Sequence, residues 1–154
     1  MTTIGIVGSE GAKFTPETEK KAREIIRKAI HGYDKVVSGA CHLGGIDVWA
    51  VEEAQNMGIP TEEFPPKRLS WEGGYKERNL AIASASNKVV CITLKQLPEH
   101  YKGMRFELCY HCGTSDHVKS GGCWTVKRAI EMGKQGEIIV INDQISCNRR
   151  RGTT

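Results

Sequence analysis

The feature that most constrains the fold of this chain is a repeated alternation of short apolar runs with amphipathic segments. Residues 3–8 form an apolar run that ends at a glycine. Thr15, Pro16 and Glu17 then supply an N-cap residue, a first-turn proline and an acidic side chain, which together predict the start of a helix. Apolar side chains recur at helical spacing until Gly32 closes the segment. The same order of apolar run, loop and helix repeats further along the chain.

This repeat predicts a layered α/β fold. Strands are predicted at residues 3–8, 35–39, 59–64, 88–94 and 137–142, and helices between Thr15 and Gly32 and at residues 46–57, 75–85 and 124–132. Strands that alternate with helices favour a parallel sheet covered on both faces, because right-handed crossovers place the helices there. We therefore predict a Rossmann-like three-layer sandwich with a mainly parallel sheet of about five strands.

The size and charge of the chain limit what it binds. Its 154 residues suit a single domain, which we place at residues 1–146, with a fraying basic tail at 147–154. The net charge is +4, and Arg149, Arg150 and Arg151 supply three of these charges, so a broad nucleic-acid surface is not favoured. The sequence shows neither a signal-peptide pattern nor an apolar run of membrane-spanning length, which predicts a cytoplasmic protein without a membrane partner.

Three glycine-bearing segments lie where such a sheet presents its strand ends and helix starts. They are residues 8–11, 38–45 and 120–122. Glycine lets backbone N–H groups approach an anion closely, and a helix N-terminus adds partial positive charge. Each segment alone is explained equally well by a tight turn, but together they predict a phosphate-bearing ligand.

The first glycine segment excludes two familiar nucleotide-binding motifs. Ile6 stands where the G-x-G-x-x-G fingerprint needs its first glycine, and the residues after Gly11 do not complete a P-loop. The pattern therefore predicts neither an NAD-dependent dehydrogenase nor an ATPase.

Four motifs carry a resemblance that covers nearly the whole chain. They are Ile6-Val7-Gly8-Ser9, Val37-Ser38-Gly39 with Gly44-Gly45-Ile46-Asp47, Tyr75-Lys76-Glu77-Arg78-Asn79, and Ser120-Gly121-Gly122-Cys123-Trp124-Thr125. In order and spacing they resemble the SLOG superfamily of Rossmann-like proteins. That group includes the lysine-decarboxylase-like phosphoribohydrolases, the DprA proteins and molybdenum-cofactor carriers.

The resemblance implies a set of residues around a nucleotide or nucleotide-derived ligand. These are Gly8, Ser9, Ser38, Gly39, Gly44, Asp47, Arg78, Asn79, Gly121, Gly122 and Thr125. Arg78 would pair with a phosphate and Asp47 with a ribose hydroxyl. The alternative for both side chains is a local role, with Asp47 as a cap or ion-pair partner and Arg78 as a solvated helix residue.

The same resemblance bears on whether the protein is an enzyme. The phosphoribohydrolases carry P-G-G-x-G-T-x-x-E, whose glutamate takes part in cleaving the bond between base and ribose. Counted from the paired glycines, that position is Arg128 here, so the carboxylate that this chemistry needs is missing. Binding is therefore favoured over hydrolysis, although Glu10, Asp47, Glu77 or Asp116 are candidate replacements that no spacing distinguishes.

A cysteine and histidine cluster precedes the last predicted helix. Cys109, Cys112, His117 and Cys123 follow the spacing C-x2-C-x4-H-x5-C, which is typical of tetrahedral zinc. We expect a structural zinc to staple residues 95–123, an insertion too short and polar to order itself by packing. The alternatives are buried thiols or a redox-active C-x-x-C pair. Other candidate ligands are His111, Cys91, Cys41 and His42, and Cys123 would then line the phosphate loop instead.

The cluster also suggests a coupling and a second kind of partner. If zinc uses Cys123, it fixes the neighbouring Gly121-Gly122 loop, and removing zinc should weaken nucleotide affinity. A less favoured hypothesis combines the cluster with Arg149 to Arg151 as a contact for single-stranded nucleic acid, with Tyr110 or Trp124 stacking on bases. The sequence leaves homo-oligomerisation open.

Overall fold

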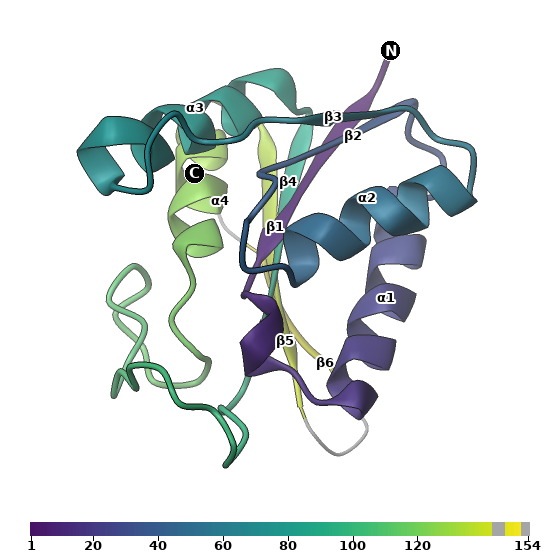
Figure 1. Cartoon of the computed structure of the whole chain (residues 1–154). Coiled ribbons are helices and arrows are strands. Elements are labelled where there is room, and N and C mark those ends of the chain that lie inside the picture. The colour runs from purple at the N-terminus through teal and green to yellow at the C-terminus, as the bar shows by residue number, and fades with distance from the viewer. Residues whose placement is uncertain (143–146, 152–154) are drawn as a thin grey trace.

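The computed structural model of the chain describes residues 1–142 and, for residues 147–151, the backbone alone. Its centre is one six-stranded sheet (Figure 1). The strands are β1 (Thr3–Gly8), β2 (Lys35–Ser38), β3 (Thr61–Glu63), β4 (Lys88–Leu94), β5 (Gln135–Ile141) and β6 (Cys147–Arg151), in the spatial order β3-β2-β1-β4-β5-β6. The first five strands pair in parallel, and β6 is antiparallel to β5. The predicted parallel sheet is confirmed.

Two helices cover each face of the sheet, which confirms the predicted three-layer sandwich. The helices are α1 (Pro16–Ile30), α2 (Ile46–Asn56), α3 (Lys76–Ala85) and α4 (Gly121–Glu131). Figure 1 shows α1 beside α2 on one side of the sheet and α3 beside α4 on the other. Within the described residues, no helix combines the length and the hydropathy that a bilayer span needs.

Alternating strand residues build one core on each face of the sheet. In β1, Ile4 and Ile6 pack with apolar residues of α1 and α2. Val7 packs on the opposite face, in the core that includes Ile82 of α3 and Val126 of α4. Successive side chains of a strand point to opposite faces, so strands buried on both sides read as continuous apolar runs. This pattern made the strands visible in the sequence.

The order of the strands fixes where a ligand can enter. β1 lies between β2 and β4. The chain that leaves β1 continues to β2 on one side of β1, whereas the chain that leaves β4 continues to β5 on the opposite side. The loops that follow β1 and β4 therefore diverge at the carboxyl edge of the sheet, and a crevice opens between them.

Two differences from the sequence-based expectation have a clear physical reason. Helix α4 begins at Gly121 rather than Trp124, because Ser120 caps it by accepting a hydrogen bond from the N–H of Gly122. Glycine has a low helix propensity, which hid this start. Within the tail expected to fray beyond Ser146, Cys147–Arg151 instead forms strand β6 along β5; residues 152–154 lie outside the described residues. Pairing with β6 satisfies backbone groups of an edge that β5 would otherwise expose.

Residues 95–120 connect β4 to α4 without a helix or a strand. Their one ladder contact is an isolated bridge between Cys109 and Thr114. Figure 1 shows this segment as a green loop region beside α4, below α3. The segment needs another source of order, because backbone ladders hold little of it in place.

Candidate ligand-binding cavity and metal centre

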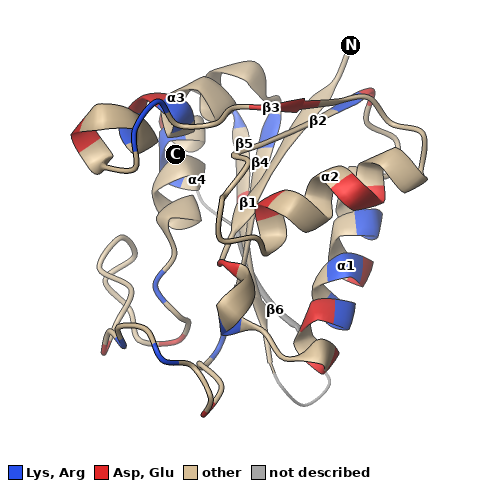
Figure 2. Cartoon of the chain, in the orientation of Figure 1, with Lys and Arg blue, Asp and Glu red and all other residues tan. Residues whose placement is uncertain are grey.

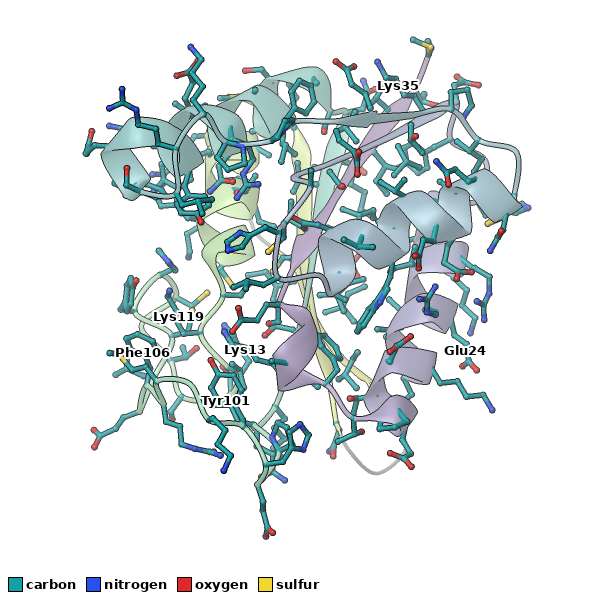
Figure 3. All side chains as sticks on the ribbon, viewed as in Figure 1. Lys13, Glu24, Lys35, Tyr101, Phe106 and Lys119 are labelled. Carbon is teal, nitrogen blue, oxygen red and sulfur yellow. The ribbon has the colours of Figure 1, made fainter. Side chains whose placement is uncertain are left out.

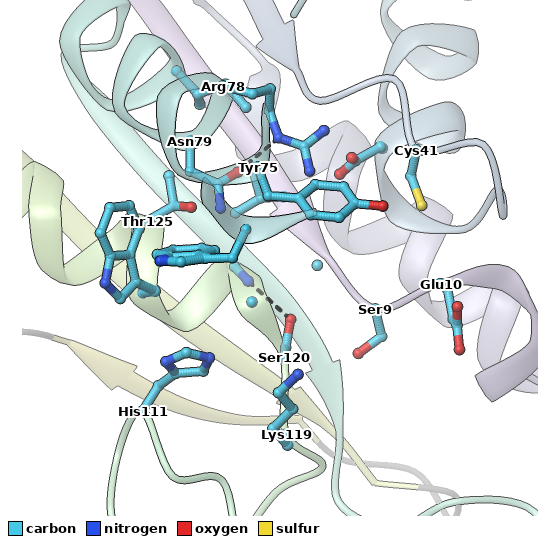
Figure 4. A pocket seen from close by; sticks show the side chains of 18 of the residues that line it. Ser9, Glu10, Cys41, Tyr75, Arg78, Asn79, His111, Lys119, Ser120 and Thr125 are labelled. Atoms are coloured by element: carbon cyan, nitrogen blue, oxygen red, sulfur yellow. Dashed lines mark hydrogen bonds between the residues drawn. The ribbon is translucent and has the colours of Figure 1, made fainter. Parts of the chain in front are cut away.

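A cavity of about 760 Å³ lies at the carboxyl edge of the sheet, at the switch between β1 and β4 (Figure 4). This volume falls within the range of small-molecule and cofactor sites. The residues that line it are Val7, Gly8, Ser9, Glu10, Lys13, Cys41, Asp47, Trp71, Tyr75, Arg78, Asn79, Ile82, Tyr110, His111, Lys119, Ser120, Gly121, Gly122, Trp124 and Thr125.

Most of the residues predicted to surround a ligand lie on this cavity. Eight of the eleven line it: Gly8, Ser9, Asp47, Arg78, Asn79, Gly121, Gly122 and Thr125. Ser38, Gly39 and Gly44 are not part of the wall. The three glycine segments, far apart in the sequence, therefore converge in space.

Ser38 and Gly39 do not line the cavity, but they hydrogen-bond to Asp47 and Arg78, which do. The hydroxyl of Ser38 donates a hydrogen bond of 3.0 Å to the carbonyl oxygen of Asp47. The carbonyl oxygen of Gly39 accepts a hydrogen bond from Nη1 of Arg78. A Cβ at Gly39 would lie 2.6 Å from Oδ2 of Asp47, so only glycine leaves room for both side chains. Gly44 has φ +73° and serves the turn before α2.

The start of α4 approaches the end of β1 very closely. A Cβ at Gly122 would lie 2.8 Å from Sγ of Cys91 and 2.9 Å from Cγ2 of Val7, so packing demands glycine there. Gly121 differs, because a Cβ added to it would meet nothing within 4 Å. Gly121 thus borders open space in the cavity, where the partial positive charge of the helix N-terminus is exposed to a ligand.

Asp47 and Arg78 form the charged part of the wall. Asp47 lies in the first turn of α2 and is 7% exposed. Burial raises the pKa of its carboxyl group to about 6, although the nearby charge of Arg78 and a backbone hydrogen bond from Cys41 act in the opposite direction. Nε of Arg78 donates a hydrogen bond of 2.7 Å to Oδ1 of Asn79, and its guanidinium stacks on the ring of Tyr75.

Thr125 carries a buried polar atom without a partner. Its side chain is fully buried, and its Oγ1 has no hydrogen-bond partner among the described residues. Figure 4 shows Thr125 and the amide of Asn79 facing the interior of the cavity. Since nearly all buried polar atoms in proteins are hydrogen-bonded, an orphaned hydroxyl in a cavity wall points to a missing partner.

Sequence reasoning missed a second set of lining residues, which are mostly aromatic or charged: Glu10, Lys13, Cys41, Trp71, Tyr75, Tyr110, His111, Lys119, Ser120 and Trp124. Trp71 and Trp124 meet edge to face with ring centroids 4.8 Å apart. Most of these residues lie in loops or short helical turns, and Trp124 lies in the first turn of α4, so no repeat in the sequence groups them. The two tryptophans, each separated by one residue from a glycine pair, were a local signal.

The four predicted metal ligands come together beside the cavity. One ligand atom from each of Cys109, Cys112, His117 and Cys123 lies within 4.8 Å of the other three. The chain makes a tight turn here, in which the N–H groups of Cys112 and Gly113 donate to the carbonyl of Cys109 at 3.1 and 2.8 Å. The cluster is therefore close enough to hold a metal ion, as predicted.

The histidine of the cluster is oriented by a neighbouring carboxylate. Nδ1 of His117 lies 2.8 Å from Oδ1 of Asp116, which leaves Nε2 facing the cluster at 3.6 Å from Sγ of Cys123. Such a carboxylate partner is typical of metal-bound histidine. A hydrogen bond from the thiol of Cys123, with help from His117, lowers the pKa of Cys109 in spite of burial. These groups favour a thiolate at Cys109, the form that binds metal, whereas burial raises the pKa of Cys112 and the hydrogen bond with Cys109 raises the pKa of Cys123.

The alternative ligands lie elsewhere. Among the described residues, the cluster consists of the four predicted side chains and excludes His111, Cys91, Cys41 and His42. The thiol of Cys91 donates to the hydroxyl of Ser120 at 3.6 Å. His111 and Cys41 line the cavity instead.

The cluster and the cavity share two segments of the chain. Tyr110 and His111 stand between Cys109 and Cys112 in the sequence and line the cavity. Cys123 belongs to the first turn of α4, whose start borders the same cavity. The metal ligands are thus positioned to fix part of the cavity wall.

Arg128, at the position of the missing catalytic glutamate, does not line the cavity. Arg128 stacks on Trp124, with its guanidinium carbon 4.9 Å from the ring centroid, and Nη2 donates to Glu131. Of the four carboxylates considered as replacements, Glu10 and Asp47 line the cavity, whereas Glu77 and Asp116 do not.

Two solved structures share the architecture of this chain. The molybdenum cofactor carrier protein MCP from Chlamydomonas reinhardtii matches 88% of this chain and 74% of its own length, with a TM-score of 0.56 and 19% sequence identity. DNA processing protein A (DprA) from Streptococcus pneumoniae matches 88% of this chain and 49% of its own length, with a TM-score of 0.51 and 17% identity. No family model and no curated protein sequence matches the chain. The likeness shows that this chain shares the Rossmann-like fold of these two proteins.

Proposed function

We propose that the protein binds a nucleotide or nucleotide-derived ligand in this cavity. The observation that carries the proposal is that three glycine-bearing segments reach one cavity at the switch point of the sheet, the first through Gly8 and Ser9, the second through Cys41 and the third through Gly121 and Gly122. Ligands of open α/β sheets bind at this place. The MCP neighbour is named as a carrier of a cofactor, which is consistent with small-molecule binding by this fold.

The wall offers a partner for each part of such a ligand. A phosphate fits the N-terminus of α4 at Gly121, where nothing blocks its approach, and Arg78 supplies positive charge. Asp47 can accept a hydrogen bond from a ribose hydroxyl. A planar ring fits against Trp71 and Trp124, which offer aromatic surface for stacking.

We further propose that the Cys/His cluster holds zinc in a structural role. Three thiolates and one imidazole match the ligand preference of tetrahedral zinc, and four protein ligands leave no open position for catalysis. Bound zinc would order the segment between β4 and α4, which contains one isolated bridge.

Two other functions have weaker support. The pKa of Asp47, about 6, suits acid-base chemistry, so hydrolysis of a nucleoside monophosphate is the second candidate, and release of free base on incubation would reveal it. DprA processes DNA by its name, but the polar groups here line a cavity of small-molecule size, and the side chains of Arg149 to Arg151 lie outside the described residues.

A charge placed at Gly121 tests the proposed phosphate position. Gly121→Asp puts a carboxylate at the first turn of α4, which stabilises a helix, but it repels an anion there. We expect calorimetric titration with nucleoside monophosphates to show at least about a tenfold loss of affinity, or roughly 1.4 kcal/mol. Gly121→Ala is the matched control, because space for its Cβ exists. Equal affinities of the Asp variant and the wild-type protein would refute the assignment.

A further inference from the structure

Two lysines lie together on the cavity wall without an acidic partner. Lys13 follows β1 in a short 3-10 turn, and Lys119 directly precedes the cap of α4. Both line the cavity. Among the residues that the structure describes, neither ammonium group forms an ion pair with a carboxylate. Two segments far apart in the sequence thus bring two positive charges to one place.

Each ammonium group has an aromatic ring next to it. Nζ of Lys13 lies 6.0 Å from the ring centroid of Tyr101. Nζ of Lys119 lies 5.2 Å from that of Phe106 and 5.1 Å from that of Tyr110. Figure 3 shows Lys13, Lys119, Tyr101 and Phe106 gathered at the same part of the molecule. Ring contacts hold the two side chains in place but neutralise neither charge.

The acidic residue nearest to this pair is engaged elsewhere. The carboxylate of Glu10 accepts a hydrogen bond of 3.1 Å from the hydroxyl of Tyr101. Burial lowers the pKa of Lys13; the charge of Glu10 raises it, and the charge of Lys119 lowers it further. The two like charges therefore share a partly desolvated wall in which the charge of Glu10 offsets only part of the burial of Lys13. Such an arrangement costs free energy unless an anion occupies the space between them.

The lysine pair adjoins the proposed phosphate position but is separate from it. Lys119 stands one residue before Ser120 and two before Gly121. The start of α4 and Arg78 already provide for one phosphate, and Oγ1 of Thr125 is a buried polar atom beside the same cavity that has no partner among the described residues. Lys13 and Lys119 provide for a further anionic group next to the first.

We infer that the ligand carries two adjacent anionic groups, as in a nucleoside diphosphate or a pyrophosphate-bridged nucleotide. This inference rests on the proposed function and specifies its ligand class. One phosphate contacts the N-terminus of α4, and the second lies between Lys13 and Lys119. A monophosphate fills only the first position and leaves the two lysines facing each other.

Matched pairs of ligands test the inference directly. Calorimetric titrations would use the metal-loaded protein at constant ionic strength with AMP and ADP, GMP and GDP, CMP and CDP, and UMP and UDP, and with phosphate and pyrophosphate. We expect at least one diphosphate to bind roughly tenfold to a hundredfold more tightly than its monophosphate, since charge-assisted hydrogen bonds are worth about 1.5–3 kcal/mol each.

Variants of the two lysines assign the preference to this pair. Lys13→Gln and Lys119→Gln should weaken diphosphate binding more than monophosphate binding, so that the ratio of the two affinities falls towards one. Lys119→Arg should preserve the ratio, because it keeps the charge. Lys102→Gln is the matched control, since Lys102 is an exposed lysine of the same insertion that does not line the cavity. Thermal unfolding of each variant shows whether it folds.

The outcomes separate this inference from the proposed function. If no mono- or diphosphate binds, both fail. If monophosphates bind as tightly as diphosphates, the nucleotide site stands and the second anion position is refuted. Equal weakening of both ligand types by the glutamine variants also refutes it, because the lysines would then act only through general electrostatic attraction.

Discussion

Two regions of this molecule bury a carboxylate, and they differ in whether that carboxylate has an ion-pair partner. Between α1 and α2, the carboxylate of Glu53 is 5% exposed and accepts hydrogen bonds of 2.8 Å from both Arg23 and Arg27. Figure 2 shows charges of both signs along these two helices. At the other end of α2, Asp47 is buried in the cavity wall and forms no ion pair among the described residues.

The difference appears in the pKa values of the two carboxyl groups. For Glu53, burial raises the pKa, but hydrogen bonds from Arg27 and Arg23 outweigh burial and lower it. For Asp47, burial prevails and the pKa rises to about 6. One helix thus carries a carboxylate that stabilises the fold and another that costs stability. Unpaired polar groups in a cavity wall are what a binding site would leave for its ligand.

Metal removal should have the largest effect, confined to the cavity side. Cys109→Ser deletes one of four thiolate or imidazole ligands, and apparent binding free energies of structural zinc are about 10 kcal/mol or more. We expect loss of bound metal by mass spectrometry, faster proteolysis within residues 95–120, and weaker nucleotide binding. The interface of α1 and α2 should stay protected in hydrogen exchange. Cys41→Ser is the control, since this thiol lies outside the cluster. Unchanged nucleotide affinity in the folded, metal-free protein would remove the coupling between metal and cavity.

Breaking the paired carboxylate should have the next largest effect. Glu53→Gln leaves two guanidinium groups without their buried partner, which should lower the free energy of unfolding by roughly 3 kcal/mol. Chemical denaturation measures this loss. Glu52→Gln should change stability by only about 0–1 kcal/mol, because its ion pair with Arg23 is solvent-exposed. Similar losses in the two variants would show that burial of Glu53 confers nothing special.

Neutralising the unpaired carboxylate should have the opposite sign. Below pH 3.8, the pKa of Asp47 in the unfolded state, its carboxyl group is protonated in both the folded and the unfolded protein and does not affect the free energy of unfolding. As the pH rises towards 6, the carboxyl group ionises first in the unfolded state, and the free energy of unfolding falls. Asp47→Asn should therefore raise the free energy of unfolding at pH 7 by about 2–3 kcal/mol and flatten its slope between these pH values. It should also weaken nucleotide binding if Asp47 holds a ribose hydroxyl. A stability loss at pH 7 would contradict the assigned cost.

The smallest effect is expected at the orphaned hydroxyl. Thr125→Val keeps the shape of the side chain and removes an Oγ1 without a partner, so stability should rise by about 1 kcal/mol. Nucleotide affinity should fall by several-fold if the ligand supplies the missing hydrogen bond. Thermal unfolding and titration calorimetry measure the two changes. A variant that is less stable than the wild type would indicate that the hydroxyl has a partner within the fold.

Local patterns were enough to place most of the elements. The helical spacing of apolar residues after Pro16 and the unbroken apolar run at residues 88–94 act over short stretches, so they remain visible in the sequence. The start of α4 at Gly121 was not visible, because the helix opens with two glycines, a residue of low helix propensity, and only close packing against Cys91 and Val7 explains the glycine at position 122. Strand β6 depends in the same way on the free edge of β5.

The sequence by itself determined the layered α/β architecture and the four clustered candidate metal ligands, because hydrophobic periodicity and ligand spacing are local properties of the chain. Eight residues of the cavity wall were implied by the resemblance of short motifs, which are local as well. Only the tertiary structure decided that Lys13 faces the same cavity as Lys119 and that Trp71 meets Trp124. It also decided that Glu53 has arginine partners and a lowered pKa, whereas Asp47, on the same helix, is buried without an ion pair and has a raised pKa. Their neighbours come from distant segments, and the electrostatic free energy of a charge depends on what packs around it.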